Sequence, residues 1–159
     1  MVLDTSLRAT HNTDRRENAF ARHLPTAGRL LLGLLFTVFG FFGLLTYFRL
    51  VPQPEAAIPP GAAAFAAALE KTGYMVPLSS GTELIVGVLL LANRFVPLAL
   101  ALIAPVIVNI FLFHAFLAPS GMTIPVIIAV LEIYLAWAYR DSFRAMLAAK
   151  AVPVRPGNQ

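Results

Sequence analysis

The chain has 159 residues, of which 58% are hydrophobic and only 13% charged, and its mean hydropathy is +0.77. This composition is typical of membrane proteins and lies outside the range of ordinary soluble domains. The absence of cysteine excludes disulfides, thiolate zinc sites and cysteine-held iron–sulfur clusters within the chain. The formal charge is +4, but the basic residues flank apolar runs, which favours contact with a membrane surface and not with nucleic acid.

Four apolar segments predict an all-α fold. They cover residues 28–50, 76–92, 95–117 and 122–139. Each is about 17 to 23 residues long, and at 1.5 Å per residue a helix of about 20 residues crosses the ~30 Å hydrocarbon layer. Only Asn93 and Arg94 separate the second run from the third, which requires a tight turn between antiparallel neighbours. We therefore expect an antiparallel four-transmembrane-helix bundle.

The distribution of Lys and Arg predicts the orientation. With four spans and both termini in the cytoplasm, ten of the twelve basic residues lie on the inner side, and only Arg49 and Lys71 lie outside. This agrees with the positive-inside rule, whereas three spans would export one basic tail. The expected location is a cytoplasmic membrane of bacterial type, crossed several times.

The expected domains are a polar cytoplasmic tail (1–27), the membrane domain (28–144) and a cytoplasmic C-terminal tail (145–159). The first tail lacks the apolar core and cleavage site of a signal peptide. The exported loop, 51–75, begins with a proline-rich stretch. A short helix then follows, with Pro60 at its start, Lys71 in its last turn and Gly73 as its stop. We expect this helix to lie in the membrane interface as a lid; a solvated connector is the alternative.

Small residues predict which faces pack. Gly33, Thr37 and Gly40 lie on one stripe of the first span, and Gly87 lies on the second, one turn after Glu83. Because lipid gives helices no hydrophobic reason to associate, such stripes mark close contacts. Glu83 should therefore point toward the packed side.

The candidate site is a group of polar residues in the outer half of the membrane. Glu83 is expected about 10 Å below the outer boundary, Asn109 about 12 Å and His114 about 5 Å. Tyr47 and Arg49 end the first span at that boundary, and Glu132, about 15 Å deep, is a secondary candidate. Ionised groups are costly in lipid, so we expect these residues to converge on the bundle axis under the lid.

The same polar residues can also be explained without a binding site. Asn109 and His114 are about 140° apart around their helix, so both cannot face one partner. Either side chain can instead form a hydrogen bond that holds two helices together. Glu132 can simply accept a hydrogen bond from Thr37 or Tyr47. A metal held by Glu83, His114 and Glu132 is not expected, because their depths spread over about 10 Å. A bis-histidine haem needs a second intramembrane histidine besides His114.

Four sequence stretches resemble the DoxX family of small four-helix membrane proteins. They are "GRLLLGLLFTVFGFFGLL" (28–45), "PPGAAAFAAALEKTGYMVPL" (59–78), "GTELIVGVLLLANRFVPLAL" (81–100) and "PVIVNIFLFHAFLAPSG" (105–121). The acid that opens the family's second span is present as Glu83, whereas the lysine that typically ends the glycine motif of the first span is missing. The resemblance implies a fold and a membrane location more than an activity; the founding members of the family are linked to quinone-reducing sulfur oxidation as membrane subunits.

Three functions remain open. The first is an accessory subunit of a redox complex, in which His114 and Asn109 donate hydrogen bonds to a quinone head group and Glu83 exchanges protons. The second is a structural scaffold, and the third is a binder of a small solute or lipid. Whether the chain belongs to an enzyme stays open. The expected partners are the lipid bilayer and a redox subunit, with self-association as a further alternative.

Overall fold

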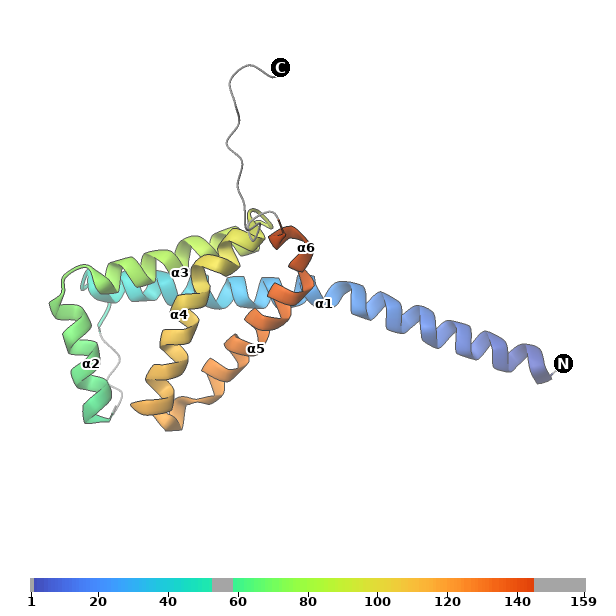
Figure 1. Ribbon diagram of the computed structural model, residues 1–159, viewed down its shortest axis with the longest axis horizontal. Helices are drawn as coiled ribbons and strands as arrows, with labels where there is room; N and C mark the ends of the chain where they lie inside the picture. Colours follow the sequence, from blue (N-terminus) through green and yellow to red (C-terminus); the bar gives the residue numbers. More distant parts are fainter. Residues whose placement is uncertain (1, 53–58, 145–159) are drawn as a thin grey trace, which may run out of the picture.

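A computed structural model describes the backbone of residues 2–52 and 59–144, and the side chains within these ranges from residue 23 onward. The described residues form helices and turns, with no strand among them. The elements in chain order are α1 (Val2–Tyr47), α2 (Pro60–Lys71), α3 (Met75–Leu91), α4 (Val96–Phe116), the 3₁₀ turn η1 (Pro119–Gly121), α5 (Thr123–Ala138) and α6 (Arg140–Phe143). Figure 1 shows their arrangement.

The four apolar helices are confirmed to within a few residues of their expected ends, except that α1 also includes the polar N-terminal segment. Within the described residues, two segments are long and apolar enough to cross a membrane: His23–Tyr47 of α1, and α4. The bent pair α2 and α3 provides a third if it counts as one broken span, and α5 is apolar but shorter, with 16 residues. The expected C-terminal tail and the centre of the proline-rich stretch, 53–58, lie outside the described residues.

Helices α1 and α3 form the most extensive contact of the fold, and they run side by side in Figure 1. Glycines allow this approach. A Cβ on Gly40 would lie 2.6 Å from the carbonyl oxygen of Ser80, and one on Gly87 would lie 2.8 Å from that of Gly33. Both distances are shorter than van der Waals contact, so only glycine fits. The glycine stripe predicted from the sequence is thus confirmed as the packing face of α1.

The turn between α3 and α4 is as tight as the sequence predicts. Asn93 and Phe95 both adopt left-handed backbone conformations, with φ of 55° and 51°. Asparagine tolerates this region, whereas an aromatic residue there is unusual. Phe95 is 64% exposed, and Pro97, the second residue of α4, has a backbone angle already suited to a helix.

The short helix predicted within residues 51–75 is also confirmed as α2. It starts with Pro60, and the chain leaves it through Gly73, whose φ of +76° favours glycine. The hydroxyl of Thr72 then accepts a hydrogen bond from the amide of Met75, 3.1 Å away, at the start of α3. As a result α2 lies at 92° to α3 and faces the far end of α4 (Figure 1).

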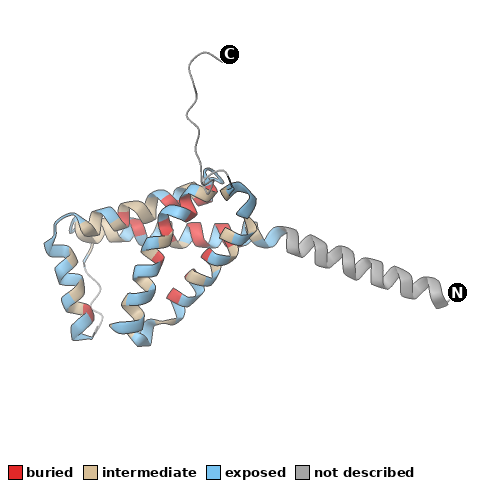
Figure 2. Cartoon of the chain, viewed as in Figure 1, coloured by how far each residue is buried: buried red, intermediate tan, exposed pale blue. Residues whose placement is uncertain are grey.

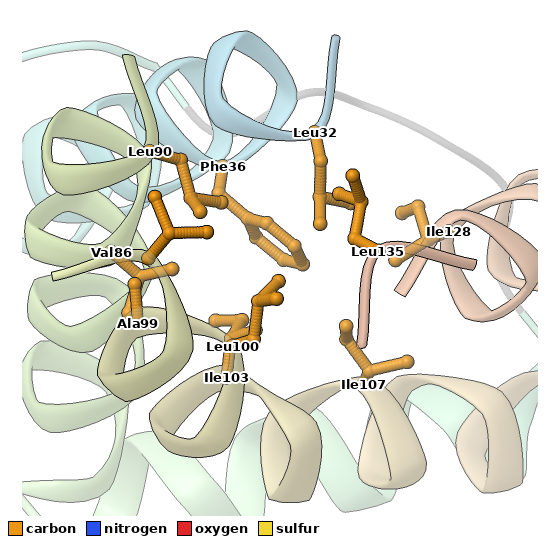
Figure 3. Packing of buried hydrophobic residues seen from close by; sticks show 11 residues of the cluster. Leu32, Phe36, Val86, Leu90, Ala99, Leu100, Ile103, Ile107, Ile128 and Leu135 are labelled. Atoms are coloured by element: carbon orange, nitrogen blue, oxygen red, sulfur yellow. The ribbon is translucent and has the colours of Figure 1, made fainter. Parts of the chain in front are cut away.

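The apolar core gathers where the four long helices meet, and this part of the molecule carries most of the buried residues in Figure 2. In Figure 3, side chains from all four helices surround Phe36 of α1. Toward η1 and α2, the α1–α3 pair and the α4–α5 pair diverge in Figure 1. The candidate site lies on this diverging side.

Candidate functional site: a pocket between four helices

Glu83 and His114, which belong to different helices, line the same pocket. Its volume is about 350 Å³, at the small end of the range for ligand pockets. The lining residues are Phe39 of α1, Glu83 of α3, Ile110 and His114 of α4, Gly121 of η1, and Ile124, Pro125 and Ile128 of α5. Apart from the acid and the imidazole, the side chains in this wall are apolar.

The carboxyl group of Glu83 is only weakly held. Its Oε1 lies 3.5 Å from the hydroxyl of Ser79, one turn earlier on α3, which is the outer limit of a hydrogen bond. Glu83 is half-buried, and Gly87, one turn further along α3, places this face of the helix against α1. The helix contact therefore orients Glu83 toward the pocket, and its second oxygen stays available to a ligand.

The orientation of His114 is set within its own helix. Its Nδ1 lies 2.9 Å from the carbonyl oxygen of Ile110. Because a carbonyl only accepts, Nδ1 must carry the proton, and Nε2 of the neutral ring then presents a lone pair. The ring lies against Gly121, where an added Cβ would be 3.1 Å from Nε2 and 2.8 Å from the neighbouring carbon. Gly121 thus leaves room for the imidazole at the pocket wall.

The structure does not bring Asn109 into this pocket. Asn109 is exposed on α4, and its side chain makes no hydrogen bond to any residue that the structure describes. The angle of about 140° between the two positions means that a helix turning His114 inward must turn Asn109 away. The expected donation from Asn109 to a ligand is therefore absent from this arrangement.

Arg49 binds α2, and Tyr47 binds the turn that follows it. The hydroxyl of Tyr47 donates to the carbonyl oxygen of Gly73 at 2.7 Å, and Arg49 pairs with Glu70 at 3.0 Å. A second, more exposed cavity of about 580 Å³ lies on this side, lined by Arg49, Ala64, Ala67, Ala68, Glu70 and Lys71. Neither Tyr47 nor Arg49 is among the residues that line the pocket of Glu83 and His114. Both residues therefore tether α2 to the end of α1.

Glu132 is buried in the core, one turn along α5 from the pocket residue Ile128, and its Oε2 has no hydrogen-bond partner among the described residues. The expectation that it accepts from Thr37 or Tyr47 is wrong. Thr37 donates to the carbonyl oxygen of Gly33 at 2.7 Å, one turn away in its own helix, and Tyr47 donates to Gly73. Glu132 does not line the pocket.

Sequence reasoning missed the role of Arg29. From the sequence, Arg29 was counted only as a charge that flanks the inner end of the first span. In the structure it is 6% exposed and donates hydrogen bonds to the carbonyl oxygens of Leu90 and Leu91 at the end of α3. The last carbonyls of a helix lack partners within it, and a cation there also complements the helix dipole. The sequence feature that could have indicated this burial is the position of Arg29 just inside an apolar run, next to Gly28.

Among the described residues, no three His, Asp or Glu side chains lie close enough together to hold a metal ion. Comparison with protein families, curated proteins and solved structures finds no match for this chain.

Proposed function

We propose that the chain crosses a cytoplasmic membrane four times, with both termini inside. The support is the apolar surface of the helices: Leu34 of α1, Ile85 of α3, Leu102 of α4 and Ile133 of α5 are 44% or more exposed. Soluble monomers rarely expose such continuous apolar surface. The distribution of Lys and Arg supports this orientation. In it, the Glu83–His114 pocket lies in the outer half of the membrane, and α2 lies in the outer interface.

We propose that this pocket binds the hydroxylated, reduced head group of a quinone, a quinol. The observation that carries the proposal is that Glu83 and His114 share one otherwise apolar pocket. An apolar ring matches the wall, and a hydroxyl group can donate to Nε2 of His114 or to a carboxylate oxygen of Glu83. Both groups also accept protons, which a quinol releases when it is oxidised.

With Glu83 ionised, this arrangement favours the reduced head group over the oxidised one. A quinone carbonyl needs a hydrogen-bond donor, but the proton of His114 is used by Ile110 and Asn109 points away from the pocket. A quinol instead brings its own donors to the two acceptors. Burying an acceptor without a donor is unfavourable, so the site with Glu83 ionised discriminates against a ligand that only accepts, whereas a protonated Glu83 would donate to a quinone carbonyl.

We further propose that the chain acts as an accessory subunit of a membrane redox complex and belongs to the DoxX family, which its sequence stretches resemble. Within this proposal the electrons pass to a flavin or haem subunit, while Glu83 and His114 bind the head group and take up its protons. Copurification of such a subunit from native membranes would support this part of the proposal.

The test is binding of ubiquinol-1 and ubiquinone-1 to the protein in lipid nanodiscs, measured anaerobically by titration calorimetry against empty nanodiscs. The wild-type protein should bind ubiquinol-1 more tightly. Glu83→Gln should weaken ubiquinol-1 binding about 10-fold or more, as expected for a lost hydrogen bond to a charged group, and should reduce the preference for the reduced form because an amide can also donate.

The matched control is Glu132→Gln, which changes a buried acid outside the pocket and should leave binding unchanged. Equal affinity for the two forms, or an equal loss in the two variants, would contradict the proposed site. If neither form binds and the variants alter only thermal stability, the chain is a scaffold. If Glu83→Gln affects the binding of a lipid or another solute instead, the quinol assignment is wrong.

A further inference from the structure

Asn109 occupies an unusual place for an amide. It is exposed at the side of α4, on a helix whose 21 residues are otherwise almost entirely apolar, and its side chain has no hydrogen-bond partner among the described residues. In the proposed topology this surface faces lipid, which offers an amide neither donors nor acceptors. A protein partner that covers Asn109 would remove this cost.

The surroundings of Asn109 form a continuous stripe. At spacings of three and four residues, Leu98, Leu102, Pro105, Asn109, Leu112 and Phe116 follow one side of α4, and all of them are exposed. This spacing keeps side chains in line along a helix. The stripe, which we call the outer stripe, lies opposite the side of α4 that carries the core residue Ile103 and the pocket residue His114. A partner here would leave the pocket undisturbed.

We infer that the outer stripe pairs with the same stripe of a second copy of this chain, and that Asn109 hydrogen-bonds to Asn109 of that copy. An amide both donates and accepts, so it complements an identical amide across a two-fold axis. All copies inserted with the same topology hold Asn109 at the same depth. A two-fold axis along the membrane normal therefore brings the two amides together without any further adjustment, which favours a second copy over an unrelated protein.

Cysteine cross-linking in native membranes tests this pairing, and the chain has no cysteine of its own to interfere. Single cysteines at Leu102 and Leu112 leave Asn109 intact and should form disulfide-linked dimers on oxidation. Cysteines at Ile85 of α3 and Ile133 of α5, which are at least as exposed, are the matched controls and should not. Cross-linking of all four variants alike, or of none, would overturn the inference.

A second comparison isolates the amide. In the Leu112→Cys background, Asn109→Leu should lower the dimerisation constant about 3- to 20-fold, the range expected for one interhelical hydrogen bond, while Asn109→Gln should retain most of it. The thermal unfolding of the detergent-solubilised monomer should be unchanged in both variants. If Asn109→Leu dimerises as well as the wild-type residue, or if Leu112→Cys cross-links only to a different protein, the proposed pair does not exist.

Discussion

At the residue scale, Gly40 and Gly81 show how differently two helical glycines are constrained. The backbone of α3 approaches Gly40 so closely that an added Cβ would lie 2.9 Å from Cα of Leu84, whereas a Cβ on Gly81 meets nothing within 4 Å. The first glycine is required by packing. The second only lowers the intrinsic stability of α3, because glycine is a weak helix former.

We therefore expect opposite effects from one substitution. Gly40→Ala should destabilise the protein by about 1–3 kcal/mol, since the two backbones must separate. Gly81→Ala should be neutral or stabilising by up to about 1 kcal/mol. Thermal unfolding of both variants in the same detergent, followed by circular dichroism, measures the difference. Equal melting temperatures would show that α1 and α3 are not in close contact.

Residue-scale prediction from sequence succeeded where the physics is local. The stripe of Gly33, Thr37 and Gly40 was visible because 3–4 spacing alone defines a helix face. The angle between Asn109 and His114 could likewise be predicted from their spacing. Which of the two faces inward could not be predicted, because this depends on how α4 is rotated against its neighbours. The hydrogen bonds of Arg29 depend on where α3 ends in space, which no spacing within the first span can indicate.

At the scale of elements, α2 is held to the rest of the fold by few side-chain attachments. On one side the attachment is polar: the Arg49–Glu70 pair, whose side chains are 74% and 42% exposed, and beside it the hydrogen bond from Tyr47 to Gly73 in the turn that follows α2. The other is apolar: the ring of Phe65 lies 5.6 Å from that of Phe113 on α4. Exposed ion pairs contribute little to stability because water competes for both charges, whereas an aromatic pair removes apolar surface from water.

The apolar attachment should therefore dominate. Phe65→Ala should increase amide hydrogen exchange throughout Pro60–Lys71, by roughly the 10-fold or more that corresponds to a loss of about 1.5 kcal/mol or more. Glu70→Gln should change exchange in the same segment less than about 5-fold. Hydrogen exchange with mass spectrometry resolves this helix as one or two peptides. A larger effect from Glu70→Gln would reverse the assignment of the two attachments.

The sequence predicted α2 well because its start and stop are local signals, a proline and a left-handed glycine. Its contact with Phe113 was not predictable, since that contact follows from the 92° bend after Gly73. The candidate site was likewise predictable only in part.

The convergence of Glu83 and His114 was expected from the cost of polar groups in lipid. The separation of Tyr47 and Arg49 from these two residues follows from the position of α2, which the sequence does not indicate.

At the scale of the whole molecule, the proposed topology makes a direct prediction. Single cysteines at Ala68 of α2 and at Asp141 of α6, both exposed, should lie on opposite sides of the membrane. A membrane-impermeant maleimide should label the first in intact cells and the second only after the membrane is permeabilised. Labelling of both in intact cells would exclude an odd number of crossings between the two positions, and with it the proposed four-span topology.

The long contact between α1 and α3 also has a consequence for how the protein is assembled. The residues that meet there, such as Gly40 and Leu84, are separated by 44 positions in the chain, so at ordinary translation speeds α1 waits about 2 to 9 s for α3. During that interval its glycine face is uncovered and complementary to any other helix with small residues that is being inserted nearby. We therefore expect a ribosomal pause between α1 and α3 to prolong the stage at which this face is free.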